Sequence, residues 1–119
     1  MSIFKICLLV FFFTMFKLQA NERYICKNLD NNENKLITNF YIINDKVIMS
    51  GASGNGDYIV LYKNYNGLIA INSSFIGNDF GLETVLLSNN YRTFTYKLYI
   101  QNNTNKNINE IKGNCENFN

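Results

Sequence analysis

The chain has 119 residues and a formal net charge of +2 at pH 7, and 47% of its residues are hydrophobic. This length allows one small domain, and domains of this size often depend on disulfides for stability. The chain contains no histidine, so a Ser–His–Asp mechanism is excluded and the commonest metal ligand is missing.

The first twenty residues have the pattern of a signal peptide. Lys5 is followed by an apolar run at residues 6–16, which at about 11 residues is too short for the roughly 20 that span a bilayer. Ala20 is a small residue of the kind that precedes a cleavage site. We therefore predict a signal peptide at residues 1–20 and a secreted or periplasmic domain at residues 21–119. An uncleaved membrane anchor is the alternative.

Removal of the signal peptide would bring the net charge close to zero. It takes away Lys5 and Lys17, which leaves nine basic residues against nine acidic ones. A near-neutral domain without a basic cluster is poorly suited to nucleic acid, whose phosphates attract clustered Lys and Arg. It also lacks the polybasic segment that anionic lipid attracts. We expect neither nucleic-acid binding nor stable membrane insertion after cleavage.

Two cysteines remain in the mature domain, Cys26 near its start and Cys115 near its end. In an oxidising compartment we expect them to form a disulfide. The loop closed by this bond has about 88 residues, and the chain-entropy account gives such a loop roughly 4–5 kcal/mol of stabilisation. The alternative is a pair of free or redox-active thiols, although the chain has no Cys-x-x-Cys motif.

The rest of the chain favours strands over helices. Runs rich in Ile, Val, Tyr, Phe and Thr are separated by Asn, Asp and Gly, as in antiparallel sheets. Asn66-Gly67 is the strongest hairpin signal. Glycine-bearing loops are expected at residues 51–57 and 75–81. The predicted strands cover residues 22–27, 36–43, 47–50, 58–64, 68–74, 82–88, 92–101 and 108–113.

These elements predict an all-β fold of about eight short antiparallel strands. Residues 92–101 alternate between apolar and polar side chains, as a half-buried strand does. With short turns and no crossover helix, the strands must close as a small barrel or stack as a sandwich. A disulfide between the first and last strands suits either architecture, and the order of the strands stays open.

The loop at residues 51–57, Gly-Ala-Ser-Gly-Asn-Gly-Asp, is a candidate binding loop. Its glycines allow close approach of a partner to the backbone, and its polar side chains offer contacts. The predicted binding residues are Ser53, Gly54, Asp57 and Tyr58. The segment is not a phosphate loop, because no Lys follows it and no helix is predicted. The alternative is a mobile connection between strands.

Three acidic residues, Asp57, Asp79 and Glu83, are the candidates for a paired-carboxylate glycan hydrolase. Solvated side chains at strand ends are the alternative, and we predict no catalytic residue, cofactor or metal site. Several tyrosines could line a ligand or cap the core, and the core is the expected place for most of them. They are Tyr58, Tyr62, Tyr65, Tyr91, Tyr96 and Tyr99.

Two resemblances follow from short motifs. The segments Tyr24-Ile25-Cys26 and Gly113-Asn114-Cys115 resemble the two ends of small periplasmic proteins of unknown function from Gram-negative bacteria. The order Ala52-Ser53-Gly54, Tyr58, Gly67 and Ala70 is similar to that of the membrane-bound class of c-type lysozyme inhibitors. The second resemblance implies a small β-barrel with Ser53 in the loop that contacts the enzyme.

The sequence thus predicts an exported, non-enzymatic domain that binds a protein or an envelope component through its loops. A lysozyme inhibitor is a specific case of this function. A glycan hydrolase and a small-ligand carrier with a cavity inside the barrel are the other classes.

Overall fold

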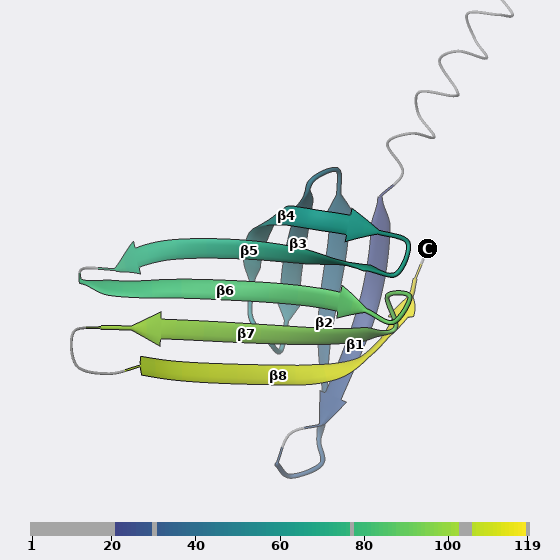
Figure 1. The fold of residues 1–119 in the computed structure, drawn as a ribbon. Coiled ribbons are helices and arrows are strands. Elements are labelled where there is room, and N and C mark those ends of the chain that lie inside the picture. Colours follow the sequence, from purple (N-terminus) through teal and green to yellow (C-terminus); the bar gives the residue numbers. More distant parts are fainter. Residues whose placement is uncertain (1–20, 30, 77, 103–105, 119) are drawn as a thin grey trace, which may run out of the picture.

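The computed structural model describes residues 21–29, 31–76, 78–102 and 106–118, so the predicted signal peptide at residues 1–20 lies outside the described part (Figure 1). The described residues form eight strands, and no helix among them is long and apolar enough to cross a membrane. The strands are β1 (Glu22–Leu29), β2 (Lys35–Ile43), β3 (Lys46–Gly51), β4 (Gly56–Asn64), β5 (Gly67–Ile76), β6 (Asp79–Ser88), β7 (Thr93–Gln101) and β8 (Lys106–Asn117).

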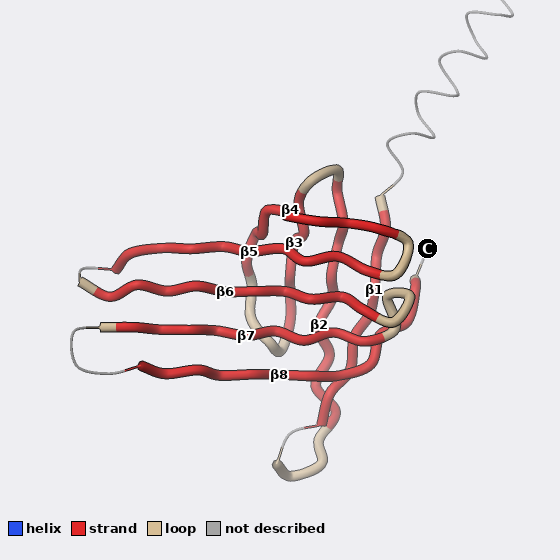
Figure 2. Tube along the Cα trace, in the orientation of Figure 1, coloured by secondary structure: helices blue, strands red, loops and turns tan. Residues whose placement is uncertain are grey.

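The strands close into an antiparallel barrel in which each strand pairs with the next one along the chain (Figures 1 and 2). The last strand, β8, returns to pair with β1. This confirms the predicted all-β fold and shows that it is a barrel rather than a sandwich. Every strand of the barrel wall therefore has a neighbour on both sides, which removes the exposed edges of an open sheet.

The predicted disulfide joins the first strand to the last. Cys26 of β1 lies directly opposite Cys115 of β8, with 4.0 Å between their Cα atoms. The backbones also approach closely at Gly113, where a Cβ would run into the carbonyl oxygen of Lys27. The bond therefore fastens the seam at which the barrel closes, and such a bond fits an oxidising compartment.

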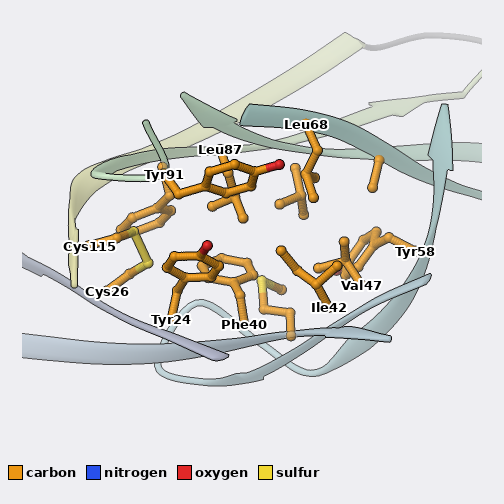
Figure 3. Close-up of a cluster of buried hydrophobic side chains, with 14 of the residues drawn as sticks. Tyr24, Cys26, Phe40, Ile42, Val47, Tyr58, Leu68, Leu87, Tyr91 and Cys115 are labelled. Carbon is orange, nitrogen blue, oxygen red and sulfur yellow. A yellow bond between two sulfur atoms is a disulfide. The ribbon is translucent and has the colours of Figure 1, made fainter. Parts of the chain in front are cut away.

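The barrel interior is filled by side chains rather than left hollow (Figure 3). Strand alternation turns every second residue inward, and the rings of Phe40 and Phe94 meet there with 5.5 Å between their centroids. The large side chains that are almost fully buried are Phe40, Ile42, Val47, Met49, Tyr58, Leu68, Val85, Leu87 and Phe94.

Two hairpins run well past the barrel wall, which corrects the loop predicted at residues 75–81. β5 continues to Ile76 and β6 begins at Asp79, and the rings of Phe75 and Phe80 pair across the hairpin at 5.2 Å. The pairing of β4 with β5 ends at Ile71, and that of β8 with β1 begins only at Asn114. The remaining four-stranded sheet, which we call the overhang, consists of residues 72–76, 79–83, 98–101 and 106–113 (Figure 1).

Candidate functional site: the open end of the barrel

The two ends of the barrel differ. Strand directions place the connection between β3 and β4 at the same end as the overhang, because the start of β4 lies beside the middle of β5. We call this the open end. The turns after β2, β4 and β6 and the C-terminal end of β8 lie at the opposite end, which we call the closed end.

Two stacked tyrosines seal the closed end. The rings of Tyr24 and Tyr91 are nearly parallel, with 5.1 Å between their centroids. Tyr91 has a positive φ of 64°, which is costly for a bulky residue. Its hydroxyl donates to the carbonyl oxygens of Asn64 (2.8 Å) and Gly67 (3.2 Å), and these bonds hold it in place. An open hollow of about 630 Å³ lies outside this seal, lined mainly by asparagines and the stacked rings.

At the open end, the candidate loop is anchored to the barrel wall. The hydroxyl of the buried residue Thr38 donates to Ser53 Oγ (2.8 Å) and accepts from the Ser53 backbone N–H (3.1 Å). The Gly54 N–H also donates to the Gly51 carbonyl oxygen at 3.1 Å. Because Ser53 Oγ is the acceptor, its own hydrogen can be donated to another group. Ser53 and Gly54 therefore lie in an anchored turn at the open end.

The other two predicted binding residues are the second and third residues of β4 and point in opposite directions. Asp57 is exposed on the outside of the barrel, whereas Tyr58 is fully buried. The Tyr58 ring folds back under the loop, where a Cβ at Gly56 would lie 2.8 Å from the tyrosine hydroxyl. Tyr58 therefore supports the loop from below, and the structure does not bring its side chain together with that of Asp57.

A half-buried carboxylate lies where the overhang leaves the barrel. Glu83 accepts hydrogen bonds from the hydroxyls of Tyr96 (2.5 Å) and Tyr58 (3.4 Å) and from the Asn72 amide (3.4 Å). Burial, together with the Glu83 carboxylate, raises the pKa of both tyrosines above the ordinary value of 10.0. Both hydroxyls therefore stay protonated and keep donating near neutral pH.

Sequence reasoning missed this Glu83 cluster. Glu83 drew attention only as one of three acidic residues, and its partners come from three other strands. The sequence contained one indication of this cluster: strand alternation places Glu83 on the same side of β6 as the apolar residues Val85 and Leu87. A charged residue at an inward position needs hydrogen-bonding partners.

The face of the overhang that continues the barrel interior is polar along β5, β6 and β8. We call its polar residues the polar shelf: Asn72, Ser74, Asp79, Glu83, Asn107 and Asn109. Leu98 and Ile100 of β7 lie between them. The polar shelf and the anchored loop thus share the open end, with Tyr58 and Glu83 linking β4 to the base of the shelf.

The structure does not bring any two of the three candidate hydrolase carboxylates together as a catalytic pair. Asp57 faces outward, whereas Glu83 faces the barrel interior. Asp79 and Glu83 lie on the same face of β6, but four residues of strand separate their Cα atoms by about 13 Å. No group of three or more His, Cys, Asp or Glu that could hold a metal occurs within the described ranges.

Comparison with known proteins adds no functional information. No protein-family model matches the chain, and no curated protein or solved structure matches it at a significant level. The two resemblances drawn from the sequence therefore stay predictions, and function is argued from geometry.

Proposed function

We propose that this protein is exported, and that the open end of its barrel binds a protein or an envelope component without catalysing a reaction. Export is supported by the signal-peptide pattern of residues 1–20 and by the Cys26–Cys115 disulfide, which fits an extracytoplasmic location. Intact-mass analysis of the protein released by its host tests export. Cleavage after Ala20 gives a mass that begins at Asn21, and the disulfide makes it lighter than the reduced protein by two hydrogen atoms.

The observation that carries the binding proposal is the polar shelf beside the anchored loop. The shelf presents amide, hydroxyl and carboxylate groups from several strands, and the strands hold these groups in fixed positions. A rigid scaffold with such groups at one end suits a partner that offers hydrogen bonds over an extended surface. The filled barrel interior, in contrast, gives no support to a small-ligand carrier.

Site-specific photocrosslinking tests the binding proposal. A crosslinking amino acid is placed at Asn109, on the polar shelf, and in a second variant at Asn114, which is also exposed on β8 but lines the hollow at the closed end. Both variants are expressed in the native host. We expect a discrete adduct with an envelope component or protein from position 109 and none from position 114. Equal adducts from both positions, or none from either, would contradict binding at the open end.

A lysozyme inhibitor is the specific form of this function suggested by the loop. Supporting it, the Ser53 hydroxyl lies at the open end with a hydrogen to donate. The expected result is slower hydrolysis of bacterial cell walls by a c-type lysozyme in the presence of the protein, with a weaker effect for Ser53→Ala. Full activity of several c-type lysozymes in the presence of the protein would contradict the lysozyme-inhibitor proposal but not the broader proposal of binding at the open end.

A further inference from the structure

The apolar side of β5 and β6 changes where these strands leave the barrel. Within the barrel wall their inward residues are apolar, as Leu68 and Val85 show. On the overhang the order is reversed, since Asn72 and Glu83 face the interior side while the paired rings of Phe75 and Phe80 face outward. An antiparallel sheet with one wet face normally puts its polar residues on that face. The outer face of β5 and β6 on the overhang therefore has the character of a covered surface.

This apolar face continues from the overhang onto the barrel wall along β4, β5 and β6. The residues on it form what we call the apolar strip: Ile59, Leu61 and Tyr62 of β4, Ile69, Ile71 and Phe75 of β5, and Phe80, Leu82 and Leu86 of β6. Cross-strand pairs such as Ile59 with Ile71 and Tyr62 with Ile69 make it continuous. Phe75 is 77% exposed, and Ile59, Leu61 and Tyr62 are each more than 60% exposed.

The size of the strip fits a protein interface. Six of its nine side chains are exposed large hydrophobic groups, and together they form a patch of the several-hundred-Å² class that on monomers is often functional. With a polar rim, such a patch approaches the ~800 Å² that each partner contributes to a stable interface of standard size.

The charge pattern indicates which partner fits. A two-fold interface brings one patch against its own copy, so the patch must be self-complementary. Between Ile69 and Leu86 the outward positions of β5 and β6 carry only apolar residues, Ser and Thr, so two copies meet without like charges. Outward charges border the strip instead, with Lys46 and Asp57 beside Ile59 on one side and Lys97 of β7 on the other.

We propose that the apolar strip is the interface of a homodimer, in which the β4–β6 faces of two copies pack as the two layers of a sandwich. Such layers lie about 10 Å apart and interdigitate their side chains. The polar shelf is on the opposite face of the overhang, so both open ends stay accessible in the dimer. The proposal does not depend on what the open end binds.

Sedimentation velocity on the disulfide-bonded protein, from low micromolar concentration upward, tests this interface. Two leucines give a matched comparison, because Leu61 on the strip and Leu29 on β1 are both 62% exposed. We expect a concentration-dependent dimer that Leu61→Lys weakens at least about tenfold, since it buries a charge at an apolar contact. Leu29→Lys should leave the dimer unchanged. Phe75→Lys, on the overhang part of the strip, should act as Leu61→Lys does.

Other outcomes overturn the proposal. A protein that stays monomeric up to about 1 mM has no such interface, whatever else the strip binds. Equal weakening by Leu61→Lys and Leu29→Lys would mean that general surface charge, not the strip, controls association. A dimer that survives Leu61→Lys and Phe75→Lys but is lost in Ser74→Lys would assign the contact to the unpaired edge of β5. Circular dichroism of each variant verifies that the barrel is folded.

Discussion

At the scale of single residues, the Glu83 carboxylate connects β6 to three other strands of the open end. It gathers two tyrosine hydroxyls and an amide from three other strands. A half-buried carboxylate is tolerated only when such donors compensate for lost hydration. These hydrogen bonds hold Tyr58 in place under the candidate loop and Asn72 in place on the polar shelf.

Replacement of Glu83 by glutamine should change how tyrosine ionises. The substitution keeps the shape and an acceptor oxygen but removes the charge that, after burial, helps to raise the Tyr96 pKa. The Tyr96 pKa should therefore fall toward 10, and tyrosinate should form at lower pH in Glu83→Gln than in the unaltered protein. Ultraviolet spectroscopy of tyrosinate during an alkaline titration measures this shift.

A matched control exists at Glu110, an exposed carboxylate that bonds to Lys97 and Lys112 rather than to a tyrosine. Glu110→Gln should leave the tyrosine titration unchanged. If the two variants titrate alike, the Glu83 carboxylate has no electrostatic effect on the tyrosines of the open end.

At the scale of elements, the sequence located the strands but not their full lengths. Hairpin signals such as Asn66-Gly67 act locally, and the structure turns one residue earlier, at Tyr65 and Asn66, with Gly67 as the first residue of β5. At residues 75–81, glycine and asparagine predicted a loop, yet Phe75 and Phe80 pair across the hairpin. Cross-strand pairing of this kind depends on two segments together, and local propensity does not contain it. The overhang was missed for this reason.

Shortening the β5–β6 hairpin tests whether the overhang serves function rather than stability. Residues 74–81 are replaced by Asn-Gly, which joins the paired residues Ser73 and Leu82 through a two-residue turn. The barrel core is untouched, so we expect the free energy of unfolding in urea to fall by no more than about 1–2 kcal/mol. The crosslinked adduct from position 109 should nevertheless be lost. A shortened protein that fails to fold would show that the overhang stabilises the barrel.

At the scale of the whole molecule, one long-range pairing decides the architecture. Whether eight strands form a barrel or a sandwich depends on β8 pairing with β1, and the cysteine positions suit both. Prediction of the candidate site from the sequence depends on long-range pairing in the same way. The glycines of residues 51–57 identified the loop, but the Glu83 cluster and the polar shelf need the register of five neighbouring strands, β4 to β8, which no single segment specifies.

The seam between β1 and β8 should depend strongly on its disulfide. These strands pair over only four positions, Tyr24 with Asn117 to Lys27 with Asn114, whereas β6 and β7 pair over nine. The bond closes a loop with a sequence separation of 89. The double variant Cys26→Ala/Cys115→Ala should therefore lose about 4 kcal/mol of unfolding free energy, a large part of the 5–15 kcal/mol typical of a domain.

Urea unfolding of the oxidised protein and the double variant measures this loss, and amide hydrogen exchange shows where it acts. In the variant, the amides of residue 115 and its neighbours on β8 should exchange first, since the seam can open while the β6–β7 pairing persists. A loss below about 1 kcal/mol, with unchanged exchange along β8, would mean that backbone pairing and the packed core close the barrel without the covalent bond.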